Sequence, residues 1–352
     1  MSGTQLEAAL RKTKGFVPYS VRHMLRRAQT RMGWPRVASH QPRAAEPVVA
    51  APKSEADQRV SDMWSQTAAL RQNAGQMGWL DSPLIQRHYV DPKFGRRDGD
   101  IWVQYLLTGH AWNRKGHWAS LGCGGGGLEC GLAQRNLFGS MDCFDISDGS
   151  LEIGRQTACR LNLPNMQFLP ADLNRVELPK ARYDVILMAM SLHHVAEIER
   201  LLTQVRHALK PGGLFMVNEY VGPTQLQHTP KTMQIMNELL QLLPEPLRVD
   251  CMTNQVRQRV EPRSREWWNQ ADPSEAVRSD RIVPALHEQF QILKQVNYGG
   301  TLLNPLLEYL VANFSAADPQ AVCILRLLCY LEDVLIREGV MENAFAAYLM
   351  KV

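Results

Sequence analysis

The chain has 352 residues, of which 45% are apolar, and a formal net charge of +4. This size can bury a large core in one or two domains, and the modest charge does not favour nucleic acid as a ligand. No apolar run approaches the roughly eighteen residues that a membrane-spanning helix needs, and no apolar segment typical of a secretory signal opens the chain. Seven cysteines without a C-x-x-C spacing indicate a reduced, intracellular protein, which we expect in the cytoplasm.

The first 57 residues combine a basic helical segment with a linker. Up to Arg43 the chain carries nine Lys or Arg residues and a single acid, Glu7. Residues 4–33 have the spacing of a basic amphipathic helix, and residues 34–57 are rich in Pro and Ala, as flexible linkers are. Three roles compete for the helix: packing on its own protein, lying on a partner or on the inner face of a membrane, or serving as an organelle transit peptide.

Residues 58–112 form a predicted helical cap that is rich in Trp, and strands and helices alternate after it. We predict strands at 117–121, 141–145, 166–170, 183–189 and 213–219, with helices at 127–138, 148–162 and 197–210. Strands separated by helices of this length form a parallel sheet with right-handed crossovers. The predicted fold is therefore α/β, a doubly wound, Rossmann-like sheet with helices on both faces.

Two regions beyond this core break the alternation. Residues 223–270 form a predicted lid insertion, and residues 301–352 carry two apolar stripes at helical spacing, which we expect to pack on the domain or on a twin subunit. The lid holds Trp267 and Trp268 beside several Arg residues, a set that suits stacking on a sugar ring, clamping a phosphate or simply a solvated surface. We accordingly divide the chain into 1–57, the cap 58–112, the sheet domain 113–300 and a C-terminal helical region 301–352.

A glycine turn follows the first predicted strand, in the sequence WASLGCGGGGLE (118–129). Such a turn can adopt positive φ, can approach a ligand closely, and directs the N–H groups of the next helix at something polar. The pattern also satisfies the dinucleotide motif G-x-G-x-x-G. Acids follow the next strands: Asp145 can accept the hydroxyls of a ribose, and Asp172 can accept an exocyclic amine.

Five segments in this order resemble the motifs of class I S-adenosylmethionine (SAM)-dependent methyltransferases: GCGGG (122–126), DIS (145–147), AD (171–172), YDVI (183–186) and LKPGG (209–213). The resemblance covers roughly residues 115–220 and implies a mostly parallel, seven-stranded sheet that binds SAM. More loosely, NEYVGP (218–223), DPSEAVRS (272–279) and GGTLLNPLL (299–307) resemble a bacterial subgroup found with enzymes of surface-polysaccharide and other glycan assembly.

The resemblance also implies the roles of single residues. The amino-acid arm of SAM would lie against Gly122, Cys123, Gly124 and Gly126, and Met188 would complete the site. Asp145 would bind the ribose, Asp172 the adenine amine, and Ile146 and Leu173 would flank the adenine ring. Ser120 stands where the family usually has an acid two residues before the first glycine. Either the affinity for the cofactor is lower for that reason, or Glu129 or another acid supplies the charge.

Methyl transfer to a hydroxyl also needs a group that takes the proton. His193 and His194 follow the fourth predicted strand, a position that borders the reacting methyl in this family, and Glu219 ends the fifth. These three are the predicted catalytic residues, with Tyr220 and His228 as weaker candidates; the histidines could instead be structural, and Glu219 could belong to a buried Glu–Arg pair. We predict no metal site, because no single element carries ligand spacing.

We therefore predict a SAM-dependent methyltransferase that acts on a hydroxyl of a small molecule or a sugar or glycan precursor, and that does not act on nucleic acid. N- or C-methylation would use the same core. The sequence is also compatible with a non-catalytic scaffold in a membrane-associated complex, with an NAD(P)-binding sheet and with a degenerate sheet that binds no ligand.

Overall fold

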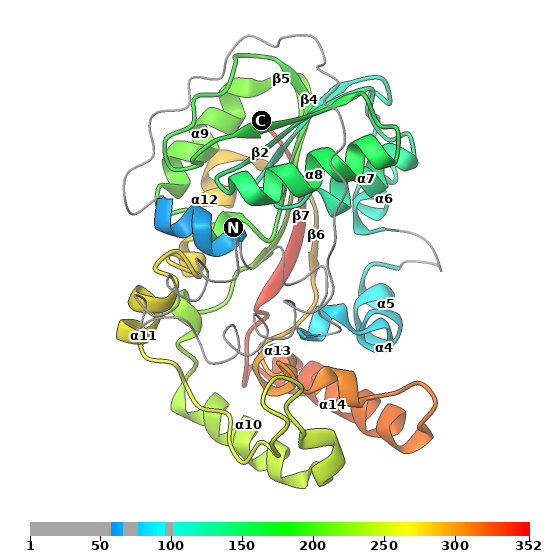
Figure 1. Ribbon diagram of the computed structural model, residues 1–352, viewed down its shortest axis with the longest axis vertical. Coiled ribbons are helices and arrows are strands. Elements are labelled where there is room, and N and C mark those ends of the chain that lie inside the picture. Colours follow the sequence, from blue (N-terminus) through cyan, green and yellow to red (C-terminus); the bar gives the residue numbers. More distant parts are fainter. Residues whose placement is uncertain (1–57, 66–76, 96–100) are drawn as a thin grey trace, which may run out of the picture.

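The computed structural model describes residues 58–65, 77–95 and 101–352 (Figure 1). Its centre is one seven-stranded sheet with the strand order β3-β2-β1-β4-β5-β7-β6. All neighbours are parallel except β7, which is antiparallel to both β5 and β6. The strands are β1 (His117–Leu121), β2 (Ser140–Asp145), β3 (Met166–Pro170), β4 (Tyr183–Ala189), β5 (Leu209–Tyr220), β6 (Gln291–Asn297) and β7 (Phe345–Lys351). The predicted mostly parallel, seven-stranded, Rossmann-like sheet is confirmed.

Helices cover both faces of this sheet because successive strand residues point to opposite sides. Trp118 and Val185 belong to the core on the face of α6, α7 and α8, whereas Ala119 and Ile186 belong to the core beneath α9 and α12. These helices are α6 (Trp102–Leu107), α7 (Gly127–Gln134), α8 (Asp148–Arg160), α9 (Ile198–Ala208) and α12 (Ser279–Gln289). The side chain of Ser147 accepts a hydrogen bond from the Ser150 N–H and so begins α8.

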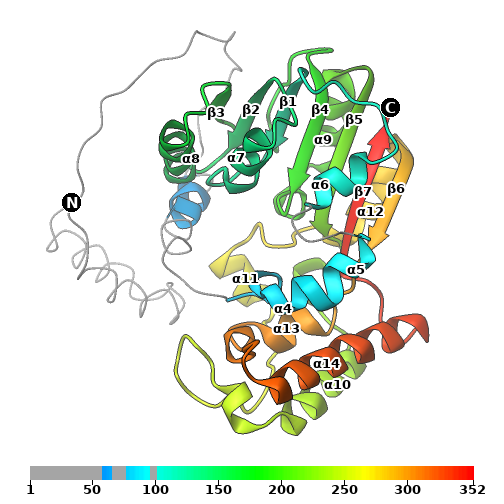
Figure 2. The same ribbon diagram turned by 90° about the vertical axis from the view of Figure 1, so that its right-hand side faces the viewer.

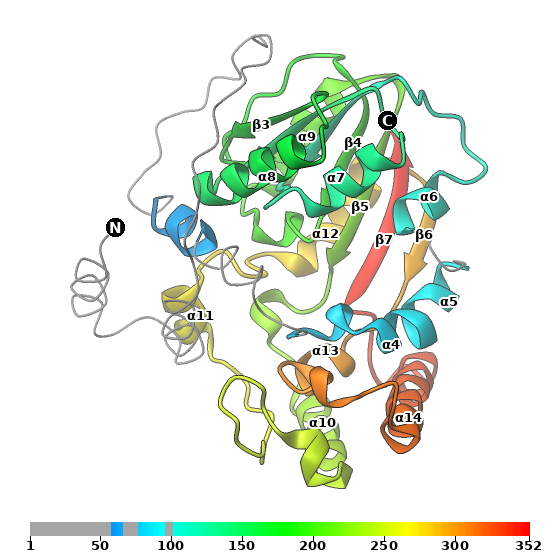
Figure 3. The same cartoon turned by 45° about the vertical axis from the view of Figure 1, so that its right-hand side comes forward.

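A second, largely helical layer lies beyond the carboxyl ends of β4 and β5 (Figures 2 and 3). Its elements are η1 (Trp79–Asp81), α4 (Pro83–Ile85), the π-helix η2 (Gln86–Val90), α5 (Asp91–Lys93), α10 (Pro230–Leu242), η5 (Glu245–Arg248), α11 (Arg265–Ala271), α13 (Leu303–Leu307), η6 (Val311–Asn313) and α14 (Pro319–Arg337). Short turns η3 (Leu192–His194) and η4 (Thr224–Leu226) follow β4 and β5. A separate helix spans residues 58–65.

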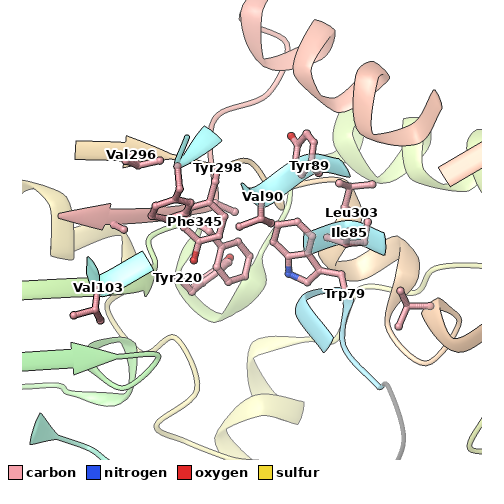
Figure 4. Packing of buried hydrophobic residues seen from close by; sticks show 14 of the residues in the cluster. Trp79, Ile85, Tyr89, Val90, Val103, Tyr220, Val296, Tyr298, Leu303 and Phe345 are labelled. Atoms are coloured by element: carbon pink, nitrogen blue, oxygen red, sulfur yellow. The ribbon is translucent and has the colours of Figure 1, made fainter. Parts of the chain in front are cut away.

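An aromatic cluster joins this layer to the sheet (Figure 4). The Phe345 ring at the start of β7 has its centroid 5.3 Å from that of Trp79 and 5.3 Å from that of Tyr220. The Trp79 ring also stacks on Tyr298 at 6.3 Å. Because these rings come from residues 79 to 345, the N-terminal cap and the C-terminal strand depend on each other for burial.

The buried carboxylate of Glu332 on α14 holds the chain between β6 and α13. It accepts hydrogen bonds from the N–H groups of Gly300, Leu302 and Leu303 and from the Tyr89 hydroxyl, at 2.6 to 2.9 Å. Burial raises the pKa of this fully buried carboxyl, although its donors oppose the shift. Glu332 therefore satisfies donors from two distant segments at once.

Three details of the sequence prediction are wrong. The strand predicted at 213–219 begins at Leu209, so the LKPGG segment lies within β5. The C-terminal region 301–352 is not only helical, because Phe345–Lys351 form β7 between β5 and β6. The helix predicted at 127–138 ends at Gln134. The predicted basic helix at 4–33 lies outside the described residues, and among the described helices none has the length and apolarity to cross a membrane.

Candidate active site

The glycine turn lies at the carboxyl end of β1, where β2 and β4 flank it on either side. This is the switch point at which open α/β sheets bind ligands. Gly122 has φ +77°, and a Cβ there would lie 2.3 Å from the Cβ of Ser191. A Cβ on Gly126, at φ +68°, would lie 2.6 Å from the Phe168 ring, whereas one on Gly124 would meet nothing within 4 Å. The turn thus needs glycine for packing at two positions and leaves open space at Gly124.

Asp145 is fixed at the end of β2 against this turn. Its Oδ2 accepts the Gly124 N–H and its Oδ1 accepts the Ser147 N–H, both at 2.8 Å. A carboxylate oxygen can accept more than one donor, so hydroxyl groups of a ligand can bind here as well. The structure therefore brings the predicted ribose-binding acid next to the open part of the glycine turn.

A buried carboxylate lies beside Ser120, the residue at the position where the family that the sequence resembles usually has an acid. Glu129, in the first turn of α7, is 2% exposed, and the Ser120 hydroxyl donates to its Oε1 at 2.7 Å. Its Oε2 is buried and has no hydrogen-bond partner among the described residues. Burial raises the pKa of Glu129 to about 7, while the Ser120 hydrogen bond opposes the shift. A cation beside Glu129 would relieve this cost of burying a carboxylate.

Five further residues that the resemblance assigns to the cofactor site lie among the described residues. Asp172 accepts the Asn174 N–H at 2.9 Å, and the Leu173 side chain approaches Gly122. The carbonyl of Ile146 accepts the Ser61 hydroxyl at 2.9 Å, so the helix at 58–65 lies over the end of β2. The other two predicted residues are Cys123, which is partly buried, and Met188, which is fully buried in the core beneath α9.

These groups fit a nucleoside that carries a cationic amino-acid arm. The open space at Gly124 leaves room for the ligand, and Asp145 can accept the hydroxyls of its ribose. Glu129 can neutralise the ammonium of its amino-acid arm. All three features occur within residues 120–147 and use the ends of two adjacent strands.

His193 and Glu219 form a buried pair at the ends of β4 and β5. The His193 Nδ1 lies 2.6 Å from Glu219 Oε2, and Glu219 Oε1 accepts the N–H groups of Ser191 and Leu192 at 2.5 Å. Burial disfavours the imidazolium, but the carboxylate of Glu219 outweighs burial and raises the pKa of His193 to about 9. The structure thus brings two predicted catalytic residues together, with Glu219 also fixing the turn that carries His193.

His194 faces the segment between α11 and α12. Its Nδ1 lies 3.1 Å from the Ser274 hydroxyl, which donates to Asp272 at 2.6 Å. Glu275 completes the cluster, because its carboxylate lies 3.8 Å from His193 Nε2 and 3.9 Å from His194 Nε2. Ser274 and Glu275 are not among the residues predicted from sequence, since nothing in the local pattern places residues eighty positions apart side by side. The ring of Trp64, from the helix at 58–65, packs edge-on against His194 at 4.9 Å.

A cavity of about 1300 Å³ opens beside these histidines. It lies between the strand ends and the helical layer, and a second hollow of about 670 Å³ shares His228 and Met233 with it. Aromatic side chains from both layers line the large cavity: Trp64, Trp79, Tyr220, Trp267, Trp268, Tyr309 and Phe345. Burial lowers the pKa of His228 to about 4, so this histidine is neutral at physiological pH.

Two of the five arginines in the predicted lid, 223–270, pair with carboxylates. Arg257 pairs with Asp250 at 2.8 Å, and Arg263 lies 3.4 Å from Glu308 while stacking over Trp267. Arginines that are already paired are less available for a phosphate. Aromatic side chains line the cavity together with these two paired arginines and with Arg259, for which no carboxylate partner is found among the described residues.

Comparisons with known proteins agree with this geometry for the central part of the chain. Residues 119–213 match the family model described as a methyltransferase domain. The ubiquinone/menaquinone biosynthesis C-methyltransferase UbiE of Ectopseudomonas mendocina is 33% identical over 86 residues, which make up 24% of this chain and 34% of that protein. UbiE of Brucella anthropi is 24% identical over 124 residues, or 34% of this chain and 47% of that protein. The matches thus span between a third and a half of these relatives.

One solved structure to which this chain is similar is an S-adenosylmethionine-dependent methyltransferase from Mesorhizobium loti. It is 15% identical, with a TM-score of 0.41, and the match covers 72% of this chain and 99% of that chain. The assignment of the domain rests on the family match and on the strand order seen here. Residues 119–213 therefore match a methyltransferase domain, and they contain the parallel strands β2 to β4 and most of β1.

Proposed function

We propose that this protein transfers the methyl group of SAM to a hydroxyl of a small, ring-bearing acceptor. The observation that carries the proposal is the position of the large cavity. It is lined by His193 and His194, two and three residues after Ser191, which packs against Gly122 of the glycine turn. An acceptor in the cavity would therefore lie beside the cofactor site.

In this reaction SAM supplies an activated methyl group on a sulfonium. The hydroxyl oxygen attacks the methyl carbon in line, the carbon–sulfur bond breaks with its electron pair going to sulfur, and the hydroxyl proton is lost. The glycine turn and Asp145 would orient the cofactor, and the cavity walls would hold the acceptor beside it. The cluster of His193, His194 and Glu275 receives the hydroxyl and promotes the loss of its proton.

The acceptor class follows from the walls of the cavity. The aromatic rings that line it suit stacking on a sugar ring or on an aromatic ring that carries hydroxyls. A sugar or glycan precursor is one such acceptor, and a phenol or quinol is another. The second hollow, which continues past His228 and Met233, would accommodate a substituent on the ring.

C-methylation is the second candidate, and the names of the UbiE relatives favour it. A phenolate can attack through oxygen or through a ring carbon, so both reactions begin with the same loss of a hydroxyl proton. The same cluster at His193 would serve either one.

The test is to incubate the full-length protein with isotopically labelled SAM and a panel of phenols, quinols and nucleotide sugars. Release of S-adenosylhomocysteine (SAH) with one acceptor class would support the proposal. Mass spectrometry and NMR of the product then separate the two candidates, because an O-methyl product loses its exchangeable hydroxyl and a C-methyl product retains it. SAH binding without turnover on any acceptor would favour a non-catalytic scaffold.

A further inference from the structure

We propose that His193, His194 and Glu275 bind a divalent transition-metal ion, and that this ion holds the acceptor hydroxyl. The proposal deepens the function proposed above and names the group that acts on the acceptor. It departs from the sequence prediction of no metal site, which considered spacing on single elements. Here the three ligands come from two loops that the fold brings together.

The three side chains converge on one point at the edge of the large cavity. One ligand atom from each lies within 4.8 Å of the other two, and Glu275 approaches both Nε2 atoms, at 3.8 and 3.9 Å. Metal–ligand bonds of about 2.0–2.2 Å to nitrogen and oxygen would place such atoms about 3–3.5 Å apart. Small rotations of the three side chains toward the ion would bring the ligand atoms to these shorter separations.

The orientation of both histidines supports this role. A metal-binding histidine presents one ring nitrogen to the ion and donates from the other to a carboxylate or another acceptor. His193 Nδ1 lies 2.6 Å from Glu219, and His194 Nδ1 lies 3.1 Å from the Ser274 hydroxyl, which is itself bound to Asp272. Each Nδ1 thus has an orienting partner, and each Nε2 faces Glu275.

The charge of the surroundings also favours a cation. Three carboxylates surround the two imidazoles: Glu219 is fully buried, Asp272 is 7% exposed, and the Glu275 side chain is 23% exposed. A divalent ion at the centre would offset this concentration of negative charge. Two imidazoles and one carboxylate suit zinc or iron(II), and such sites leave positions open for substrate.

The ion would act as a Lewis acid on the acceptor. The hydroxyl oxygen binds the metal, which lowers its pKa, and its proton passes to water in the open cavity. The metal-bound oxygen then forms the bond to the methyl carbon while the carbon–sulfur bond breaks, with its electron pair remaining on sulfur. No oxidant or reductant is consumed, so the metal keeps its oxidation state.

Cobalt(II) is a suitable probe because its visible absorption reports its ligands. The full-length protein, freed of metal with a chelator and dialysed, should bind one Co²⁺ per chain and release it to Zn²⁺. His194→Ala and Glu275→Gln should abolish this binding, and Glu219→Gln should weaken it about 10–100-fold through loss of the orienting carboxylate. His228→Ala, which changes another histidine of the same cavity, should leave Co²⁺ binding unchanged.

SAH binding, measured on every variant by calorimetry, controls for folding and separates the two proposals. Variants that bind SAH normally but not Co²⁺ would support the metal site. Absence of Co²⁺ binding in the unaltered protein at millimolar metal, or equal binding in His194→Ala and Glu275→Gln, would overturn it. Co²⁺ binding together with a failure to bind SAH would leave the metal site standing and contradict the proposed methyl transfer.

Discussion

The proposed cofactor side and the proposed acceptor side of the site are assembled in different ways. On the cofactor side, the glycine turn, Glu129 and Asp145 come from 26 consecutive residues, 120–145, and from two adjacent strand ends. On the acceptor side, the cavity walls come from segments as distant as Trp64 and Phe345. A site built from one continuous segment keeps its geometry with the sheet, whereas a site built from many segments depends on how the two layers pack.

This difference predicts that changes on the acceptor side will alter turnover or stability while cofactor binding persists. Changes on the cofactor side should instead lower the affinity for SAM, which a single carboxylate can control. Single substitutions on each side test this separation.

The largest effect is expected from His193→Asn on methyl transfer. Asn can still donate to Glu219, which keeps that buried carboxylate partnered, but it removes the ring nitrogen that faces Glu275. We expect kcat to fall by about 10²–10⁴. Steady-state kinetics with the acceptor found in the screen measures this, and calorimetry should show SAH affinity within about threefold of the unaltered protein. A parallel loss of SAH affinity would contradict the separation of the two sides.

Glu332→Ala should destabilise the helical layer. It leaves three backbone N–H groups and the Tyr89 hydroxyl without their buried acceptor. Each such donor costs about 1–3 kcal/mol, so with four donors we expect the free energy of unfolding to fall by at least about 4 kcal/mol in chemical denaturation. The matched control is Glu338→Ala, just past the end of the same helix, where the exposed pair with Arg337 should change stability by less than about 0.5 kcal/mol. Equal effects of the two changes would refute the role given to Glu332.

Glu129→Gln should weaken binding of SAM without affecting 5′-methylthioadenosine, which lacks the amino-acid arm. A loss of one charge-assisted interaction corresponds to about tenfold in affinity, which calorimetry with the two ligands would measure. Ser120→Ala is a milder control, because it removes only the hydroxyl that donates to Glu129.

The same carboxyl predicts a pH dependence of binding. The pKa of Glu129, raised by burial to about 7, makes this group neutral below that pH. SAM affinity should therefore fall as the pH is lowered through 7, while the affinity for methylthioadenosine stays constant. Parallel pH profiles for the two ligands would show that Glu129 does not contact the ammonium.

The same contrast explains what the sequence could and could not predict. Periodicity and the glycine turn were enough for β1 to β4 and for the placing of Asp145, because those signals are local. β7 was missed because its sequence FAAYLMK follows two helical stripes, and its partners β5 and β6 are distant along the chain. Glu275 was missed for the same reason, since only the packing of α12 against η3 brings it to the histidines.

The most direct test of the cofactor site is calorimetric titration of the full-length protein and of Asp145→Ala with SAH. We expect micromolar binding that falls by about 100-fold or more in the variant, because it lacks the carboxylate that accepts the Gly124 N–H and that we propose binds the ribose hydroxyls. Thermal melting of both proteins shows whether the variant is folded. Absence of binding in the unaltered protein, or equal affinity in a folded Asp145→Ala variant, would contradict the assignment of this site to SAM.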